Sequence, residues 1–279
     1  MIKITADSTC DLSQALIEKY NIAISPLHVL VEEEDFLDGV TITPKDLFNY
    51  VENENKTCST AAINTYEYEQ FFAKHAKEND AVIHINLGMQ FSSCFQNANI
   101  AAQNFENVYV IDSANLSTGS GHIVLAAHDF ISQGLDVNEI VKRLNELTAK
   151  VNASFVIDKM DYLKRGGRCS SVEAFGATLL KIKPSIEVKA GKMEVGKKYR
   201  GSFKNSLDKY IKDRFESIES IDPKRVFITH PMVDEEIVQY VYDLVASYNY
   251  FEEIHITNAG CTVSSHCGPH TLGVLYVTK

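Results

Sequence analysis

The stretch AVIHINLGMQFSSCFQNANIAAQNF, residues 81–105, is the clearest guide to the fold in this sequence. Its first part, AVIHINLG, is a short and mostly apolar run, which is typical of a buried strand. In its second part, bulky or small apolar residues recur at helical spacing, at positions 95, 98, 102 and 105. A strand that leads directly into a helix is the repeating unit of an α/β protein, so this stretch predicts that class.

The same alternation extends over the rest of the first half of the chain. Strands are predicted at residues 2–8, 22–31 and 108–115, and helices at residues 11–20, 42–52, 122–134 and 137–151. The helix at 42–52 opens with Thr43 and Pro44, an N-cap residue followed by a residue favoured in the first turn. This half therefore predicts a mainly parallel sheet covered by helices.

The pattern changes after about residue 152. SIEVKAGKMEVGKKY, residues 185–199, predicts an antiparallel hairpin that turns at residues 190–192. The other strands are predicted at 153–158, 225–230, 252–259 and 271–278, and helices between 158 and 185, at 203–215 and at 236–248. Because a hairpin is predicted only in the second half, we expect two α/β domains, residues 1–152 with a mainly parallel sheet and residues 153–279 with a mixed or antiparallel sheet. A cleft between two such domains is a common ligand site.

Charge and composition exclude some classes of partner. The chain has 27 basic and 37 acidic residues, a net charge of -10. Nucleic acids and anionic membrane surfaces bind clustered Lys and Arg, so neither is an expected partner. No apolar run is long enough for an integral membrane segment, and the six cysteines are scattered without a C-x-x-C pair. We therefore expect a cytoplasmic protein with reduced thiols.

Two polar stretches in the first sixty residues are candidates for ligand contacts. Asp7-Ser8-Thr9 follows the first strand, and ligands of parallel sheets bind beyond such strand ends. The alternative is a helix-capping loop that leads to Asp11. Thr57-Cys58-Ser59-Thr60 reads as a polar turn, which either presents hydroxyls and N–H groups to an anion or caps a helix.

The serine pair Ser92-Ser93 lies where the helix of the opening stretch begins. Free N–H groups and the helix dipole favour an anion at this position. Ser93 with Gln96 three residues later also fits a capping box, so capping is the expected role of Ser93. Ser92, one residue earlier, is expected to face a ligand.

The stretch MDYLKRGGRCSS, residues 160–171, is a basic cluster on an acidic chain. Gly166-Gly167 permits a tight turn, from which Arg168 projects beside Lys164 and Arg165. Such a cluster binds a phosphate or the carboxylates of a partner, unless it is only a solvated loop.

The C-terminal stretch SSHCGPHTLG, residues 264–273, raises the question of a metal or a nucleophile. His266, Cys267 and His270 lack a fourth ligand at any familiar spacing, so we predict no metal site. Neither Cys261 nor Cys267 stands in a recognisable helix-start or nucleophile motif. Isolated hydroxyls and one imidazole suit an apolar ligand with a single polar head group.

Over nearly its whole length the chain resembles the bacterial DegV-like fatty-acid-binding proteins. The matching motifs, in chain order, are ITADSTCDL, IAISPLHVLV, the polar turn at Thr60, FSSCFQNA, VIDS, DYLKRGGRCSS, LLKIKPSIEVKAGKM and GCTVSSHCGPHTLGV. The resemblance implies a two-domain DegV-like fold that holds a long-chain fatty acid, such as hexadecanoate, in a tunnel between the domains. It also implies that this carrier is not an enzyme, uses no cofactor, and presents the acid to a fatty acid kinase, whose acyl phosphate feeds phospholipid synthesis.

Site residues carry over by position. The resemblance implies that Thr60 and Ser92, with Ser93 and His266 beside them, bind the carboxylate. A protonated His266 would add a charge-assisted hydrogen bond. Arg168 and Arg200 would contact the kinase or the phosphate of the product.

The sequence departs from the family pattern at three places. Ala61 follows Thr60, and Gly88-Met89 follows a strand, where the family usually has hydroxyl residues; His270 replaces a small residue. We interpret His270 as local variation. Two alternatives therefore stay open: a hydrolase or transferase acting on an acyl or phosphate substrate through His266 and a nearby Ser or Cys, and a binder of another amphipathic acid.

Overall fold

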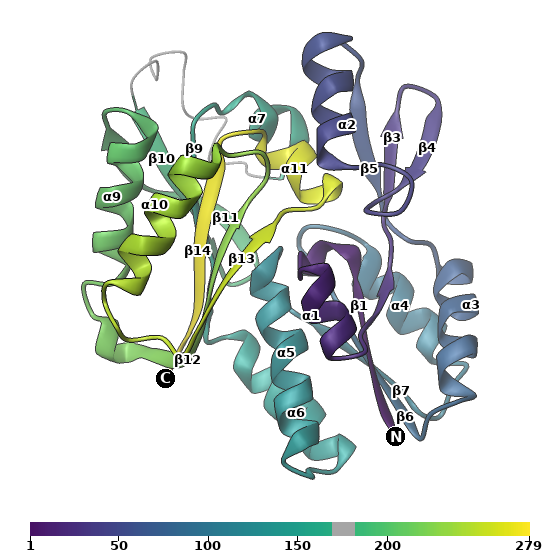
Figure 1. Cartoon of the computed structure of the whole chain (residues 1–279). Helices are drawn as coiled ribbons and strands as arrows, with labels where there is room; N and C mark the ends of the chain where they lie inside the picture. Colours follow the sequence, from purple (N-terminus) through teal and green to yellow (C-terminus); the bar gives the residue numbers. More distant parts are fainter. Residues whose placement is uncertain (169–181) are drawn as a thin grey trace.

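Three β-sheets form the frame of the protein in the computed structural model, which describes residues 1–168 and 182–279 (Figure 1). One is a parallel sheet in the order β2-β1-β6-β7, and one is a mixed sheet in the order β11-β10-β9-β14-β12-β13, with β8 also paired to β14. The third is a small antiparallel sheet, β4-β3-β5. The predicted α/β fold with one parallel and one mixed sheet is confirmed. No helix of the described residues is long and apolar enough to cross a membrane.

The parallel sheet carries helices on both faces. Its strands are β2 (Ala23–Ser25), β1 (Ile2–Asp7), β6 (Ala81–Asn86) and β7 (Val108–Asp112). In Figure 1, α3 (Thr65–Ala76) and α4 (Cys94–Ala102) lie together on one side of it, and α5 (Thr118–Ser132) and α6 (Val137–Thr148) on the other. The short α1 (Gln14–Lys19) begins at the N-cap Ser13, whose side chain accepts the Leu16 N–H. The strand-helix unit predicted from residues 81–105 is β6 and α4.

Helix α5 lies between the two large sheets. Ten consecutive residues of it, from Thr118 to Ala127, are buried, so it has no solvent face in this part. A helix that is buried all round needs a partner on each side. Here these partners are β1 and β6 of one sheet and β14 of the other. One continuous apolar core therefore joins residues of both sheets, for example Ile83 and Leu275.

The mixed sheet has β14, the last strand in the sequence, in its middle. Its strands are β8 (Val151–Asn152), β9 (Ser154–Ile157), β10 (Ile182–Lys189), β11 (Lys192–Arg200), β12 (Ile221–His230), β13 (Glu253–Asn258) and β14 (Thr271–Thr278). Helices α9 (Phe203–Arg214) and α10 (Glu235–Ala246) pack together against it. The β10–β11 hairpin is confirmed, with Ala190 and Gly191 at φ 47° and 76° in the turn and Lys192 already paired with Lys189.

The small sheet corrects two predictions. Residues 22–31 are not one strand: β2 ends at Ser25, and β3 (His28–Val31) belongs to another sheet, because Pro26 lies between them and has no N–H to donate. The first half also contains an antiparallel hairpin, β3 with β4 (Glu34–Leu37), which the absence of a clear turn signal concealed. The third strand is β5 (Cys58–Ala61).

Helices α2, α7 and α11 complete the part of the fold near the small sheet. Helix α2 (Pro44–Phe48) begins, as predicted, at Thr43, which forms a capping box with Asp46. Helix α7 is Asp161–Gly166, and α11 is Cys261–Cys267. Cys169 and the last residues of the predicted stretch 160–171 lie outside the described residues.

Candidate ligand site

A cavity of about 140 Å³ lies where the parallel sheet, the small sheet and α11 meet. It brings together five of the six predicted site residues, namely Thr60, Ser92, Ser93, Arg168 and His266. Arg200, exposed at the end of β11, is not among the residues that line it. The remaining wall consists mainly of apolar side chains: Leu27, Ala61, Ala62, Leu87, Phe91, Leu116, Met193, Val263 and Cys267.

The polar end of this cavity is built by a strand and a helix that are far apart in sequence. Thr60 lies in β5, paired with Val29 of β3, and is therefore in a strand and not in the predicted turn. Its Oγ1 lies 3.0 Å from Nε2 of His266, in α11. The other ring nitrogen of His266, Nδ1, is buried and has no hydrogen-bond partner among the described residues. The imidazole is thus held at one nitrogen only.

The charge at this end resides on Arg168. Burial, and secondarily the positive charge of Arg168, lower the pKa of His266 from 6.5 to about 4. His266 is therefore neutral at pH 7 without a ligand, and the protonated imidazole that was expected requires the bound carboxylate to raise this pKa. Desolvation disfavours the imidazolium form, and a neighbouring cation disfavours it further.

Gly166 and Gly167 are each required for a different structural reason. A Cβ at Gly166 would overlap Nδ1 of His266, so only glycine lets α7 approach the imidazole this closely. Gly167 ends α7 in the left-handed conformation, with φ 63°, which favours glycine. The chain then places Arg168 at the cavity, where it is exposed and donates from Nη1 to the Gly166 carbonyl at 2.8 Å.

The serine pair behaves differently from the predicted capping box. Ser93 is the N-cap residue of α4, but its side chain makes no capping hydrogen bond. Instead Oγ of Ser92 accepts the Cys94 N–H at 3.2 Å and donates to Cys94 Sγ at 3.1 Å. The capping role predicted for Ser93 is wrong, and its exposed hydroxyl is available at the cavity.

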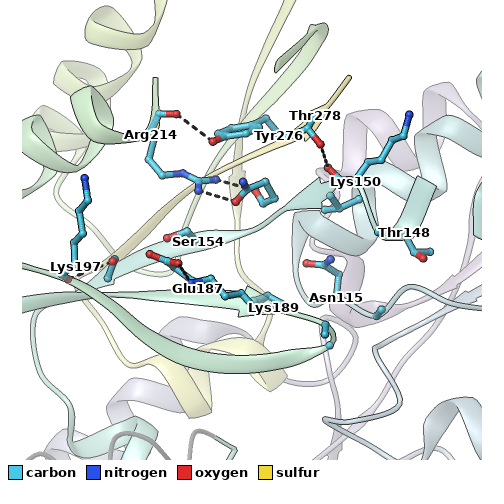
Figure 2. Close-up of a pocket in the computed structure, with 18 of the residues that line it drawn as sticks. Asn115, Thr148, Lys150, Ser154, Glu187, Lys189, Lys197, Arg214, Tyr276 and Thr278 are labelled. Carbon is cyan, nitrogen blue, oxygen red and sulfur yellow. Dashed lines mark hydrogen bonds and ion pairs between the residues drawn. The ribbon is translucent and has the colours of Figure 1, made fainter. Parts of the chain in front are cut away.

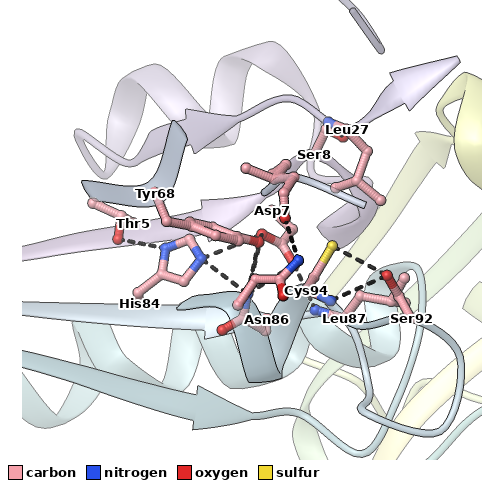
Figure 3. Close-up of polar contacts among 12 residues, drawn as sticks. Thr5, Asp7, Ser8, Leu27, Tyr68, His84, Asn86, Leu87, Ser92 and Cys94 are labelled. Carbon is pink, nitrogen blue, oxygen red and sulfur yellow. Dashed lines mark hydrogen bonds and ion pairs between the residues drawn. The ribbon is translucent and has the colours of Figure 1, made fainter. Parts of the chain in front are cut away.

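A buried polar network positions the loop that carries these serines (Figure 3). The Asp7 carboxylate, at the end of β1, accepts hydrogen bonds from the Leu87 N–H at 2.9 Å, the Tyr68 hydroxyl at 2.7 Å and the Asn86 amide at 3.1 Å. His84 adds a contact to the same carboxylate at 3.2 Å. Asp7 precedes the 3-10 turn Ser8–Cys10 without a side-chain capping bond and does not line the cavity, and its network fixes the start of the loop after β6.

Two threonines at the cavity are absent from the predicted fatty-acid-binding residues, although Thr9 belongs to the candidate stretch Asp7-Ser8-Thr9. Thr9 and Thr262 are 0% and 4% exposed, and both line the cavity. Neither hydroxyl has a hydrogen-bond partner among the described residues. A buried polar group without a partner costs free energy, so these hydroxyls mark a place where a polar ligand atom is favourable. Only three-dimensional contacts reveal this, because threonine is common in strands and loops.

Helix α11, which carries His266, is held at its N-terminus by the first half of the chain. Asp38 accepts the N–H groups of Cys261 and Thr262 at 2.7 and 3.1 Å, and Asp11 accepts the Gly260 N–H at 2.8 Å. Cys261 therefore does begin a helix, contrary to the prediction. Burial and Asp38 nevertheless raise the pKa of its thiol well above the usual value, which disfavours a thiolate nucleophile.

A second, smaller cavity of about 20 Å³ adjoins the first. The two share Leu116, Val263 and Cys267 in their walls. The second cavity reaches Phe155 and Leu275, two core residues of the mixed sheet. It therefore lies on the side of the first cavity that faces the core between the two large sheets.

The family profile described as "Uncharacterised protein, DegV family" matches residues 1–279. The chain belongs to the DegV family. A DegV domain-containing protein of Clostridium perfringens is 31% identical over 280 residues, which cover 100% of this chain and 99% of the relative.

Solved structures of DegV proteins share the whole fold. A fatty-acid-binding DegV family protein from Thermus thermophilus superposes with a TM-score of 0.92 at 27% identity, covering 100% of this chain and 99% of that one. A stearic acid-binding protein from Eubacterium ventriosum superposes with a TM-score of 0.88 at 25% identity, with the same coverage.

The departures from the DegV pattern fall at different distances from the site. Ala61 lines the cavity, whereas Gly88 and Met89 do not. Met89 is 53% exposed, and a Cβ at Gly88 would lie 2.9 Å from the Asn115 backbone nitrogen. His270 has φ 55° and packs its ring near Phe203, away from both cavities.

Proposed function

We propose that this chain is a carrier that binds one long-chain fatty acid, and not an enzyme. The observation that carries the proposal is a cavity with unpartnered hydroxyls at one end and apolar walls beyond. The T. thermophilus and E. ventriosum proteins, which share the fold over the full chain, are described as binding a fatty acid and stearic acid.

The carboxylate of the acid fits the polar end. Thr60, Ser92 and Ser93 offer hydroxyl donors, together with the buried hydroxyls of Thr9 and Thr262. A carboxylate taken from water needs several such donors, because an unpaired buried charge is costly. Arg168 supplies the opposite charge at the exposed side of the cavity. Neutral His266 contributes one ring N–H or orients Thr60, depending on its tautomer.

We place the acyl chain along the apolar walls beyond the polar end, which have to move apart to hold a long chain. It would run past Leu116, Val263 and Cys267 into the second cavity and toward Phe155 and Leu275. Burial of each CH₂ group stabilises the complex by roughly 0.8 kcal/mol, which offsets the cost of ordering the chain. We include in this proposal the division into domains 1–152 and 153–279, with the tunnel between them.

The proposed partner is a fatty acid kinase in the cytoplasm, to which the carrier presents the carboxylate. Arg168 is exposed beside the head-group end, and Arg200 is exposed at the end of β11, so both can meet a protein surface or a phosphate. Arginine suits either role because its planar group pairs with carboxylates and phosphates.

Native mass spectrometry of the freshly purified protein tests the carrier proposal. We expect one bound species of roughly 250 to 300 Da, a size at which protein cavities bury most of a ligand. The Thr60→Ala, Ser92→Ala double variant should lose it, and the matched control Ser59→Ala, exposed on the same strand, should retain it. A ligand-free protein or a bound non-lipid would contradict the proposal.

Activity assays test the remaining parts. Acyl phosphate formation by the fatty acid kinase of the same genome should require this chain and should slow with Arg200→Ala at unchanged fatty acid binding. Turnover of simple esters or phosphates by the protein alone, abolished in His266→Ala, would overturn the carrier reading in favour of a hydrolase.

A further inference from the structure

A third cavity, of about 630 Å³, lies beside α9 at the mixed sheet, and nothing above assigns it a role (Figure 2). Its walls come from β9, β10, β11, β14 and α9, and from residues 148–152 and 114–115. It shares no wall residue with the fatty acid site. The β10–β11 hairpin separates the two, since Met193 lines one cavity and Glu187 the other. The volume is that of a typical small-molecule site.

The charge of this cavity is opposite to that of the chain. Its walls contain four basic residues, Lys150, Lys189, Lys197 and Arg214, and two acidic residues, Glu187 and Asp213. Lys189 pairs with Glu187 at 2.7 Å, and Lys197 with Asp213 at 3.2 Å. Across residues 1–168 and 182–279, neither Lys150 nor Arg214 has a carboxylate within ion-pair distance. Two cations are therefore left without a counterion on a protein of net charge -10.

Arg214 is held rigidly by neutral groups. Nη1 donates to Asn152 Oδ1 at 2.7 Å, and Nη2 donates to the Asn152 and Val274 carbonyls at 2.9 and 3.3 Å. The guanidinium lies 4.3 Å from the centre of the Tyr276 ring, and its Nε is buried without a partner in the described part of the chain. A partly buried charge that only neutral groups contact is stabilised by a bound anion.

Unpartnered polar side chains at the same cavity support a ligand. Ser154 is 0% exposed, and its Oγ has no hydrogen-bond partner among the described residues. Figure 2 shows Ser154 near Arg214 among the residues that line the cavity. Buried polar groups are almost always hydrogen-bonded in native proteins, so the unpaired Ser154 Oγ and Arg214 Nε at one cavity point to a missing polar ligand.

We propose that this cavity binds a small phosphate monoester, whose two negative charges Arg214 and Lys150 compensate. A phosphate accepts several hydrogen bonds, which matches Arg214 Nε, the Ser154 hydroxyl and the ammonium group of Lys150. Lys150 is exposed, so its flexible side chain can turn toward the bound group. The rest of the molecule lies against Tyr199 and Tyr276, whose rings line the cavity. This site does not depend on the proposed function.

Calorimetric titration of the whole protein with ribose 5-phosphate and adenosine monophosphate tests the proposal, with ribose and adenosine as matched probes lacking the phosphate. We expect a phosphate ester to bind at least tenfold more tightly than its unphosphorylated counterpart. Lys150→Gln should weaken this binding at least tenfold, and Arg214→Gln as much or more. Lys142→Gln, an exposed lysine on α6 outside the cavity, is the control.

Lys150→Gln keeps the test decisive if Arg214→Gln fails to fold, because Lys150 is exposed and its side chain makes no ion pair in the described residues. Its fatty acid content should equal that of the wild type, which separates the two sites. No binding of either ester at millimolar concentration, equal affinity in Lys150→Gln, or equally tight binding of citrate would each overturn the proposal.

Discussion

Thr60 and His266 are separated by 206 positions in the chain, yet their side chains meet at 3.0 Å. We predict that Thr60→Val, which keeps the β-branched shape suited to β5, lowers fatty acid affinity about tenfold, since a hydrogen bond to a charged group contributes about 1.5 kcal/mol or more. Displacement of a fluorescent fatty acid measures this. The thermal midpoint should change little, and Ser59→Ala, on the same strand, should leave the affinity unchanged.

A second residue-scale prediction concerns the electrostatics of the head-group end. Arg168 is the second cause of the low pKa of His266, after burial. Arg168→Gln should therefore raise that pKa from about 4 in the ligand-free protein, while leaving it below 6.5 because burial persists. Nitrogen-detected NMR titration of the imidazole reports the change. Arg165→Gln, in the preceding helix α7, is the control, and an equal pKa in both variants would contradict the assignment.

Single residues differ in how far the sequence reveals their role. The resemblance to DegV-like proteins placed Thr60, Ser92, Ser93, Arg168 and His266 as site residues, and one cavity contacts them all. Thr262 carries no such mark, and Thr9 stands out only as part of the candidate stretch 7–9, because an unpaired hydroxyl is defined by its neighbours in space. The low pKa of His266 in the ligand-free protein was not predictable for the same reason: it depends on burial and on Arg168, which spacing in the sequence does not show.

At the scale of elements, the two glycines at the end of α7 should respond differently to substitution by alanine. Gly166→Ala should displace the imidazole of His266 and weaken fatty acid binding, because the added methyl group overlaps Nδ1. Gly167→Ala meets nothing within 4 Å, so its cost is the left-handed backbone alone, about 1 kcal/mol of stability. Urea denaturation and ligand displacement, measured on both variants, separate the effects. Equal losses of affinity would contradict this account.

Elements were predictable where local patterns were strong. The β6–α4 unit and the β10–β11 hairpin follow from apolar periodicity and from Ala190-Gly191 in the turn. Helix α11 was missed because CTVSSHC is poor in helix-forming residues and is held by Asp38 instead. Three of the residues 57–60 belong to β5, which forms because β3 pairs with it. A strand that depends on a distant partner has no clear pattern in its own sequence.

At the scale of the whole molecule, α5 leads to a prediction on pH. Burial lowers the pKa of His122 from 6.5 to about 3, and its Nε2 lies 3.1 Å from the Leu275 carbonyl of β14. The folded-state pKa is below the unfolded value, so the unfolded chain binds more protons between these limits. This contribution to stability is complete above pH 6.5 and is lost as the pH falls toward 3.

The variant His122→Gln isolates this effect. It should be less stable than the wild type at pH 7, and the difference should shrink at pH 5, as measured by urea denaturation. The comparison with a variant is needed because Asp11 acts in the opposite direction. Burial raises its pKa to about 8, so its ionised form destabilises the fold and acidification relieves this. An equal stability difference at both pH values would show that His122 does not contribute to the pH dependence of stability.

The class of the fold was predictable, but the packing of the two large sheets against α5 was not. Alternating strands and helices predicted a parallel sheet followed by a mixed one, and the structure contains both. The sandwiching of α5 between them depends on contacts such as those of α5 with β14, between segments more than a hundred residues apart. Such long-range packing is set by shape and burial, which a pattern of apolar residues does not encode.

The position of β14 in the mixed sheet has a consequence for folding during synthesis. This strand lies between β9 and β12; the adjoining α11 supplies walls of the 140 Å³ and 20 Å³ cavities, and Leu275 lines the smaller one. Until β14 has been synthesised, β9 and β12 have open edges, which are templates for aggregation. We expect a nascent chain arrested before residue 271 to bind no fluorescent fatty acid, so that binding requires the synthesis of β14.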